Sequence, residues 1–485
     1  MPILDILLAE ARNGAANLSD LVRGRGLRLG VTGLSRAGKT VFITALARHL
    51  TLLGKNGKNA LPAFRVAEEG RVIGGRLEPQ PDDNVPRFAY EDHLAALAGP
   101  ERHWPQSTRQ ISQLRLRLEF ERREGFMAGG SSMTIDIVDY PGEWLLDLPL
   151  LQKTYAEWSR ETFEASAGAA RASLASDWRG FAATLLPGAP EDEGQARQAA
   201  EKFTAYLRAS RTDSYALSTL PPGRFLMPGD LDGSPALTFA PLPLSEGFVI
   251  EPGSLAAMME RRYEAYKTFV VKPFFQHHFA RLDRQIVLVD ALAALNSGAE
   301  AVRDLQRGIN DVLGAFRTGN NTWFNTLFRP RIDKILIAAT KADHLHHLSH
   351  DRLEAILRQL SARSIARAEG FGAQVDVIAL AAVRATREAQ IKYGKDTLDA
   401  IVGTPIKGEA LDGHVFDGDT EAAVFPGQLP DDPREAFRGD TLATPEHEAD
   451  VRFLRFRPPQ TPLDTPPAQI RLDRACQFLF GDWMP

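Results

Sequence analysis

The chain has 485 residues, of which 44% are hydrophobic and 25% are charged, a composition ordinary for a globular protein of roughly two to four domains. Its net charge of −5 argues against broad nucleic-acid binding, so we expect no nucleic-acid partner. The single cysteine, Cys476, excludes a disulfide framework and a cysteine-cluster zinc site. We interpret it as a buried apolar side chain in a cytoplasmic protein.

Residues 1–26 begin the chain with apolar side chains at helical spacing. Ile3, Leu4, Leu7 and Leu8 would share one helix face. The segment has neither the basic leader nor the cleavage site of a secretory signal, and no apolar run in the chain approaches the roughly 18 residues of a membrane span. Few basic residues flank this amphipathic helix, so we expect it to pack on the protein itself, with peripheral membrane contact as the weaker alternative.

Residues 33–40 match a complete phosphate-binding loop, Gly-x-x-x-x-Gly-Lys-Ser/Thr. The apolar residues 27–32 before it indicate a buried strand, and an amphipathic helix pattern follows it. Glycines let successive backbone amides point inward around phosphate groups. The predicted nucleotide contacts of this loop come from Ser35, Arg36, Ala37, Gly38, Lys39, Thr40 and Val41. Lys39 would reach the β- and γ-phosphates, and the Thr40 hydroxyl would bind Mg²⁺. The alternative is a glycine-rich turn that happens to precede a helix.

The next strands follow at irregular intervals. Leucines at 114, 116 and 118 alternate with charged residues, which predicts a half-solvated strand, and a turn-rich stretch joins it to a strand over 133–139. Together they make a hairpin. Buried strands are predicted at 286–290, 334–339 and 375–380, with helices through 302–316 and 353–367 between them. Short apolar strands that alternate with amphipathic helices predict an α/β fold with a mostly parallel sheet covered on both faces.

Two stretches lie outside that alternation. Residues 145–282 fall between consecutive strands and are predicted to be largely helical, with one helix over 195–209 and another capped by Ser254. The second helix carries Met258, Tyr263, Tyr266 and Phe269. Beyond about residue 400, short strand-like pieces at 422–425 and 451–456 indicate a small mixed α+β domain. The predicted segments are thus an N-terminal helix (1–26), two parts of an α/β domain (27–144 and 283–400), a helical insertion (145–282) and a C-terminal domain (401–485).

An Asp-x-x-Gly segment follows the strand over 133–139. Asp139 would hold Mg²⁺ through water, and the backbone amide of Gly142 could contact a γ-phosphate. An Asp-initiated turn would account for the same residues. The functional interpretation is favoured because the segment lies at the carboxyl end of a predicted strand, where α/β sheets bind ligands.

The residues that follow the strand over 334–339 match the segment with which GTPases recognise guanine. In Thr340-Lys341-Ala342-Asp343, the Asp343 carboxylate would accept hydrogen bonds from the ring N–H and the amino group of guanine. Adenine offers an acceptor in place of the N–H and lacks the amino group, so it would leave a buried carboxylate unpaired. Lys341 would lay its aliphatic stem along the base. After the last strand, the backbone amides of Ala382 and Val383 would meet the guanine carbonyl oxygen.

In this order the segments resemble a Ras-like GTPase domain interrupted by a large insertion. The amino-acid sequence is similar to that of the YcjX family at residues 33–40, 104–108, 139–144 and 340–343, and the resemblance runs nearly end to end. It implies a Ras-like P-loop fold with a helical insertion and a C-terminal domain, in a bacterial stress-associated GTPase that uses GTP or GDP with Mg²⁺. No residue by itself indicates a stress function.

A switch of this kind needs a hydroxyl that binds Mg²⁺ only while the γ-phosphate is present. Ser107 and Thr108 both qualify, and we prefer Thr108, which would act in both metal binding and catalysis. Glu143 stands where such proteins often carry a Gln that positions water, and a carboxylate beside a triphosphate predicts slow hydrolysis. Catalytic roles are therefore predicted for Lys39, Thr108, Gly142 and Glu143. Arg36 or Arg109 could supply positive charge, although solvation on the surface is the stronger interpretation.

Three further interpretations accompany the leading one of a guanine-nucleotide switch. The insertion begins just beyond Glu143, so we expect it to contact a protein effector. An ATPase with the same phosphate loop, or a scaffold that holds a nucleotide without turnover, would satisfy part of the pattern.

His344, His346 and His347 follow Asp343, but no carboxylate or further histidine lies near them at ligand spacing, which favours a helix start over a metal site.

Overall fold

The computed structural model describes most of the chain. All but the last residue of the predicted helix over 1–26 lies outside the described part, as do the candidate site residues Ser35, Arg36, Ser107, Thr108 and Arg109. The described residues are 26–33, 37–54, 60–80, 82–106, 110–123, 130–210, 220–228, 231, 233–314, 332–393, 396–411, 413–437 and 453–485. Within these ranges, no helix combines the length and the apolar character needed to cross a membrane.

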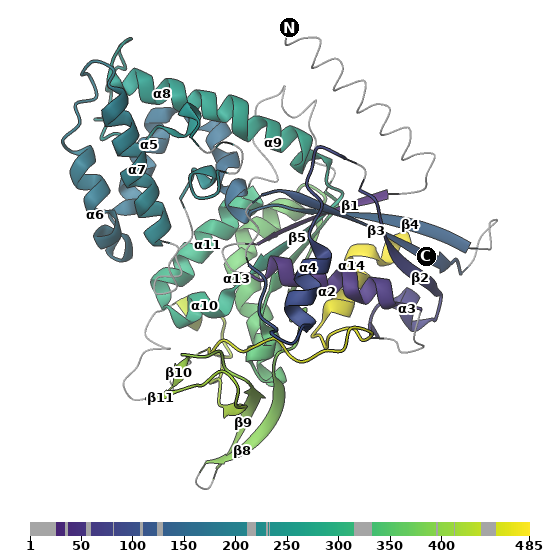
Figure 1. Cartoon of the computed structure of the whole chain (residues 1–485). Helices are drawn as coiled ribbons and strands as arrows, with labels where there is room; N and C mark the ends of the chain where they lie inside the picture. Colours follow the sequence, from purple (N-terminus) through teal and green to yellow (C-terminus); the bar gives the residue numbers. More distant parts are fainter. Residues whose placement is uncertain are drawn as a thin grey trace.

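A seven-stranded sheet in the order β2-β3-β4-β1-β5-β6-β7 forms the centre of the molecule (Figure 1). Its strands are β1 (Gly26–Gly33), β2 (Val72–Glu78), β3 (Ser112–Glu121), β4 (Gly130–Asp139), β5 (Arg284–Val289), β6 (Lys334–Ala339) and β7 (Gln374–Ala379). The pairs β2–β3 and β3–β4 are antiparallel, and β4, β1, β5, β6 and β7 run parallel to one another. The predicted hairpin and mostly parallel sheet are confirmed, whereas the edge strand β2 was not predicted.

The strand β3 is less solvated than its alternating pattern predicts. Arg115 is buried, and its Nε and Nη2 atoms donate to Oδ1 and Oδ2 of Asp136 on β4 at 2.5 and 2.7 Å. This two-point contact satisfies both charges, which is what a buried ion pair requires. The expectation of a solvated charge at position 115 is therefore wrong, because its partner on the neighbouring strand lets it be covered.

Helices cover both faces of the sheet. On one face, α2 (Lys39–Leu52), α3 (Arg65–Glu68), α4 (Tyr90–Ala98) and α14 (Leu472–Phe480) share a buried core with strand residues such as Leu29, Leu288 and Leu336. On the other face, α10 (Ala291–Asn296), α11 (Ala299–Gly314) and α13 (His350–Glu369) pack against alternate residues such as Val287 and Ile337. The strands are apolar on both sides, as parallel strands buried in two layers must be.

The predicted insertion between β4 and β5 is helical. It contains η1 (Gly142–Gln152), α5 (Tyr155–Ser166), α6 (Ala169–Ala182), α7 (Glu193–Ser210), η2 (Gly223–Phe225), η4 (Pro235–Leu237), α8 (Leu255–Tyr266), the π-helical η5 (Lys267–Val271), α9 (Lys272–His277) and η6 (Phe279–Arg281). Helices α5 to α8 lie to one side of the sheet (Figure 1). Ser254 caps α8 as predicted, by accepting from the backbone N–H of Ala257. Phe269 lies beyond α8 in η5, with 74% of its surface exposed.

The insertion shares its core with the sheet. Trp158 stacks on Tyr263 with ring centroids 5.2 Å apart, and Trp178 stacks on Tyr206 at 5.5 Å. These aromatic side chains belong to the same buried cluster as the residues of α11, α13 and the sheet face beneath them. A movement of the insertion would therefore be transmitted to the sheet, and the reverse, because closely packed interiors transmit strain.

The last hundred residues are divided between a small sheet and the central core. Strands β8 (Arg387–Tyr393), β9 (Asp396–Gly403) and β12 (Ala422–Val424) form an antiparallel sheet in the order β12-β9-β8, and β10 (Ala410–Leu411) pairs with β11 (His414–Val415). In contrast, α14 packs in the core of the central sheet and buries Cys476 there, as predicted for that cysteine. A separate C-terminal domain is thus not confirmed.

Candidate nucleotide-binding site

The phosphate-loop segment joins β1 to α2, and its described part is Gly33 and residues 37–40. Gly38 has φ of 76°, a left-handed conformation that glycine adopts without strain, and it stands directly before the first residue of α2. The first turn of α2 contains Lys39 and the buried Thr40. The free N–H groups and the positive end of the dipole of a 14-residue helix therefore face the loop, which suits the binding of an anion.

The structure brings Lys39 and Asp139 into contact. Lys39 Nζ lies 2.5 Å from Asp139 Oδ1, and the side chains are only 11% and 1% exposed. They meet because β1 and β4 are parallel neighbours in which Val31 is paired with Asp139. The Asp139 carboxylate and the Thr40 hydroxyl are hard oxygen donors of the kind that Mg²⁺ prefers, so this donor set fits the predicted ion.

Gly142 lies against the beginning of the phosphate loop. A Cβ atom built on Gly142 would be 2.0 Å from the carbonyl oxygen of Gly33, so only glycine fits here. The next residue, Glu143, is 5% exposed within η1. A Cβ atom on Gly223 of the insertion would lie 2.1 Å from the Glu143 carbonyl oxygen. The Asp-x-x-Gly segment is therefore packed between the loop on one side and the insertion on the other.

Two contacts fasten η1 to later segments of the insertion. The guanidinium carbon of Arg224 lies 3.3 Å from the ring centroid of Trp144. The Asp147 carboxylate accepts hydrogen bonds from the backbone N–H of Gly223 at 2.7 Å and from the hydroxyl of Tyr266 at 2.5 Å. Burial raises the pKa of Asp147 to about 7, because desolvation disfavours its charged form more than these donors favour it. Neither contact was predicted.

The guanine-recognition segment follows β6, at the same carboxyl ends of the parallel strands as the phosphate-loop segment. Lys341 has φ of 62°, which is rare for a residue other than glycine, and its Nζ forms an ion pair with Asp290 at the end of β5. Asp343 is 4% exposed, and its Oδ2 accepts from the backbone N–H of Ala385 at 2.8 Å. The hydroxyl of Thr386 donates to the carbonyl oxygen of Asp343.

The loop after β7 is therefore joined to the guanine-recognition segment, although mainly through residues that were not predicted. Ala385 and Thr386 contact Asp343, while Ala382 and Val383 precede them on the same loop. The Val383 side chain lines a crevice with Thr44, Leu97 and Pro467. The predicted backbone contacts of Ala382 and Val383 with guanine stay predictions.

Comparisons with known proteins identify the family. The model of the YcjX-like family, DUF463, matches residues 27–484. The chain belongs to the YcjX-like family. It is 37% identical over 468 residues to a protein of Escherichia coli (strain K12) named Ras-like GTPase YcjX, covering 94% of this chain and 96% of the relative. It is 32% identical over 504 residues to a protein of the same name from Shewanella oneidensis, covering 99% of each.

Membership of the YcjX-like family agrees with the fold, since the seven-stranded α/β sheet is consistent with a Ras-like P-loop fold. The site residues that sequence reasoning missed share one property. Each contacts a residue of another segment: Asp290 pairs with Lys341, Ala385 donates to Asp343, Asp147 accepts from Gly223, and Arg224 covers Trp144. Only Asp290 carried a signal, because it ends a predicted strand at the same sheet edge as Thr340.

Proposed function

We propose that this chain is a guanine-nucleotide-binding protein that hydrolyses GTP slowly with Mg²⁺ and acts as a nucleotide switch. The observation that carries the proposal is the convergence of two half-sites at the carboxyl ends of parallel strands. Lys39 and Asp139 form one half, and Asp343 forms the other. The names of the two relatives, both Ras-like GTPases, support the same class of activity.

At the phosphate end, Lys39 would exchange its ion pair with Asp139 for the β- and γ-phosphates. Thr40 and Asp139 would then hold Mg²⁺, with Thr108 as a second hydroxyl ligand. When bound, this ion neutralises charge on the β- and γ-oxygens. The amide of Gly142, which packs on Gly33, would lie within reach of the γ-phosphate and would leave it on hydrolysis. Loss of that contact would release η1.

At the base end, one oxygen of Asp343 is already oriented by the N–H of Ala385. The remaining lone pairs of the carboxylate would accept the ring N–H and the amino group of guanine. Because Asp343 is almost fully buried, adenine would leave these remaining lone pairs without a donor, and that penalty supplies the selectivity. Lys341, held by Asp290, would cover the base with its stem.

Slow turnover follows from Glu143. A buried carboxylate next to the γ-phosphate would be repelled by it, so it would position water less well than the neutral amide of Gln. We expect Glu143→Gln to hydrolyse GTP faster than wild type in single-turnover measurements. A Glu143→Gln variant with unchanged or lower turnover would contradict this role for Glu143.

The test of nucleotide class is a titration of GDP, GTP, ADP and ATP, with Mg²⁺ present, against wild type and Asp343→Asn. We expect tight guanine binding in wild type and a preference moved toward xanthine nucleotides in the variant. Asp376→Asn on β7 is the matched control, because that carboxylate is 38% exposed and pairs only with Arg358 among the described ion pairs. Equal affinity for adenine nucleotides, insensitive to Asp343, would favour the alternative of an ATPase.

The same preparations separate a switch from a scaffold. GTP turnover that is lost in Lys39→Ala would support the hydrolase. Tight guanine binding with no turnover in wild type would favour a scaffold that holds the nucleotide as a structural ligand.

The insertion is the part of the molecule that we expect to respond to the γ-phosphate and to contact an effector. Its Gly223, Arg224 and Tyr266 contact η1 directly. Hydrogen exchange in α5 to α8 should therefore differ between GDP and a non-hydrolysable GTP analogue in wild type. The difference should shrink in Asp147→Asn, and equal exchange in both nucleotide states of wild type would contradict the proposal.

A further inference from the structure

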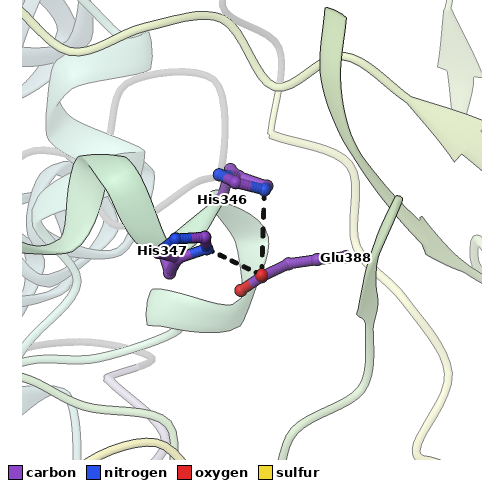
Figure 2. Close-up of side chains that lie close together, drawn as sticks. All are labelled: His346, His347 and Glu388. Carbon is purple, nitrogen blue, oxygen red and sulfur yellow. Dashed lines mark hydrogen bonds and ion pairs between the residues drawn. The ribbon is translucent and has the colours of Figure 1, made fainter. Parts of the chain in front are cut away.

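Two histidines and a glutamate meet beside the guanine-recognition segment (Figure 2). His346 and His347 follow Asp343 by a few residues, and Glu388 lies near the beginning of β8. His347 Nδ1 is 2.8 Å from Glu388 Oε2, and His346 Nε2 is 3.7 Å from the same oxygen. No carboxylate at ligand spacing was found in the sequence, but the fold brings Glu388 to His347 from 41 residues further along the chain.

The spacing of these three side chains suits a metal ion. One ligand atom from each lies within 4.8 Å of the other two. Tetrahedral Zn²⁺ with ligands at about 2.0–2.2 Å places neighbouring ligand atoms roughly 3.3–3.6 Å apart. The observed separations of 2.8 and 3.7 Å lie on either side of that value, so small rotations of the side chains would close the site.

The surroundings also favour a ligand over a simple ion pair. A hydrogen bond to Glu388 accounts for His347, which is 59% exposed. It does not account for His346, whose side chain is 12% exposed and whose Nε2 is too far from Glu388 for a hydrogen bond. Its buried Nδ1 also has no hydrogen-bond partner among the described residues. A metal ion on Nε2 would give this imidazole the partner that the protein does not.

Arg384 orients the carboxylate. Its Nη2 donates to Glu388 Oε1 at 3.2 Å, which leaves Oε2 directed at the two histidines. Outer contacts of this kind commonly fix a metal-binding carboxylate. The charge of Arg384 would weaken cation binding compared with a closed four-ligand site.

We propose that His346 Nε2, His347 Nδ1 and Glu388 Oε2 bind one divalent transition-metal ion of the Zn²⁺ class, with water completing the coordination. Imidazole nitrogens select this class over Mg²⁺ and Ca²⁺, which prefer oxygen ligands throughout. The ion would cross-link the loop after β6 to β8. Asp343 lies in the same loop after β6, and Thr386 directly precedes β8, so the metal site lies next to the base end without sharing a residue with it.

The test uses the full-length protein, freed of metal with a chelator and without nucleotide, so its outcome is independent of the proposed GTPase function. Zn²⁺ is titrated in competition with a chromophoric chelator against wild type, Glu388→Gln and a His346→Ala/His347→Ala double variant. Wild type should bind one equivalent of Zn²⁺, and both variants should bind it at least about tenfold more weakly. Loss of an outer-shell contact already costs about tenfold in metal affinity, and loss of a direct ligand should cost no less. His414→Ala removes an exposed histidine elsewhere and should behave as wild type.

Co²⁺ provides a measurement that does not depend on the variants. Wild type should give visible absorption bands of nitrogen and oxygen coordination rather than the spectrum of the aqueous ion. Zn²⁺ should also raise the melting temperature of wild type more than that of Glu388→Gln. Equal Zn²⁺ binding in wild type and the double variant, or an aqueous Co²⁺ spectrum with wild type, would overturn the proposal.

Discussion

The phosphate end and the base end of the candidate site are held by different parts of the chain and in different ways. At the phosphate end, η1 is fastened to later segments of the insertion by the Asp147 carboxylate and by Arg224 on Trp144. At the base end, Asp343 is fixed by hydrogen bonds with Ala385 and Thr386 of the next loop. At both ends a buried carboxylate accepts from a backbone N–H, but burial raises the pKa of Asp147 to about 7, so the contact at the phosphate end changes with the charge of that carboxylate near neutral pH. We infer that the base end provides selectivity and the phosphate end provides response.

The C-terminal residues belong to the base end. Phe456 meets the ring of His344 edge-on, and Ile470 exchanges backbone hydrogen bonds with Ala381. The same segment accepts a hydrogen bond from Trp104 Nε1 at the Phe456 carbonyl oxygen, at 2.6 Å. Trp104 stands shortly before the predicted switch residue Thr108. The C-terminal segment therefore braces the base end and also holds Trp104.

The largest effect is expected from the charge of Asp147. Its pKa is raised from 3.8 to about 7, so the folded state keeps a proton that the unfolded state loses between these values. The stability from this group is full below about pH 4 and is lost as the pH rises through 7, which amounts to roughly 4 kcal/mol. In urea unfolding, Asp147→Asn should lack this part of the pH dependence, and Asp376→Asn should keep it. If the free energy of unfolding depended on pH in the same way in wild type and Asp147→Asn, the proposed titration of Asp147 would be wrong.

Lys39→Ala should separate affinity from selectivity. Loss of its charge-assisted contact with phosphate should weaken the binding of GDP and GTP by roughly 10- to 100-fold, which corresponds to about 1.5–3 kcal/mol. The ratio of guanine to adenine affinity should stay as in wild type, because the base contacts are untouched. Lys392→Ala, at an exposed position on β8, is the control. A changed ratio of guanine to adenine affinity in Lys39→Ala would contradict the inference that only the base end provides selectivity.

Arg224→Ala tests the aromatic contact on η1. Removing the half-buried cation from the face of Trp144 should lower the free energy of unfolding by about 1–2 kcal/mol in urea titrations. Arg261 offers a matched control on α8, because it pairs with Glu191 but is 60% exposed. Arg261→Ala should cost less than about 1 kcal/mol, as exposed ion pairs do. Equal losses in the two variants would show that the contact with Trp144 has no special weight.

The smallest effect is expected from Trp104→Phe, which removes the hydrogen bond to Phe456 and one ring of the half-buried indole. A single neutral hydrogen bond contributes about 0.5–1.5 kcal/mol, and the partly buried position of Trp104 favours the lower half of this range. Urea unfolding measures the change at a pH fixed for both proteins. A loss larger than that in Arg224→Ala would place the stronger fastening at the base end and reverse the comparison.

The sequence predicts those parts of the fold and site whose pattern lies within a short stretch of neighbouring residues. The glycine spacing of residues 33–40, the apolar runs of β5, β6 and β7, and the segment 340–343 are each complete within a few positions. The pairs Arg115–Asp136, Asp147–Gly223 and His347–Glu388 are not, because they join residues 21, 76 and 41 positions apart. The edge strand β2 was missed for another reason, since Gly74 and Gly75 interrupt its apolar pattern.

The place of β1 in the sheet has a consequence for how the chain folds. One edge of β1 pairs with β4, which is available early in synthesis, whereas its other edge pairs with β5 only after the whole insertion has been made. The backbone of Arg28 bonds to Asp283, 255 residues further along the chain. Contacts of such long range are slow to form, and an unpaired strand edge invites wrong partners while it waits. The length of the insertion thus sets how long the strand that precedes the phosphate loop stays open on the growing chain.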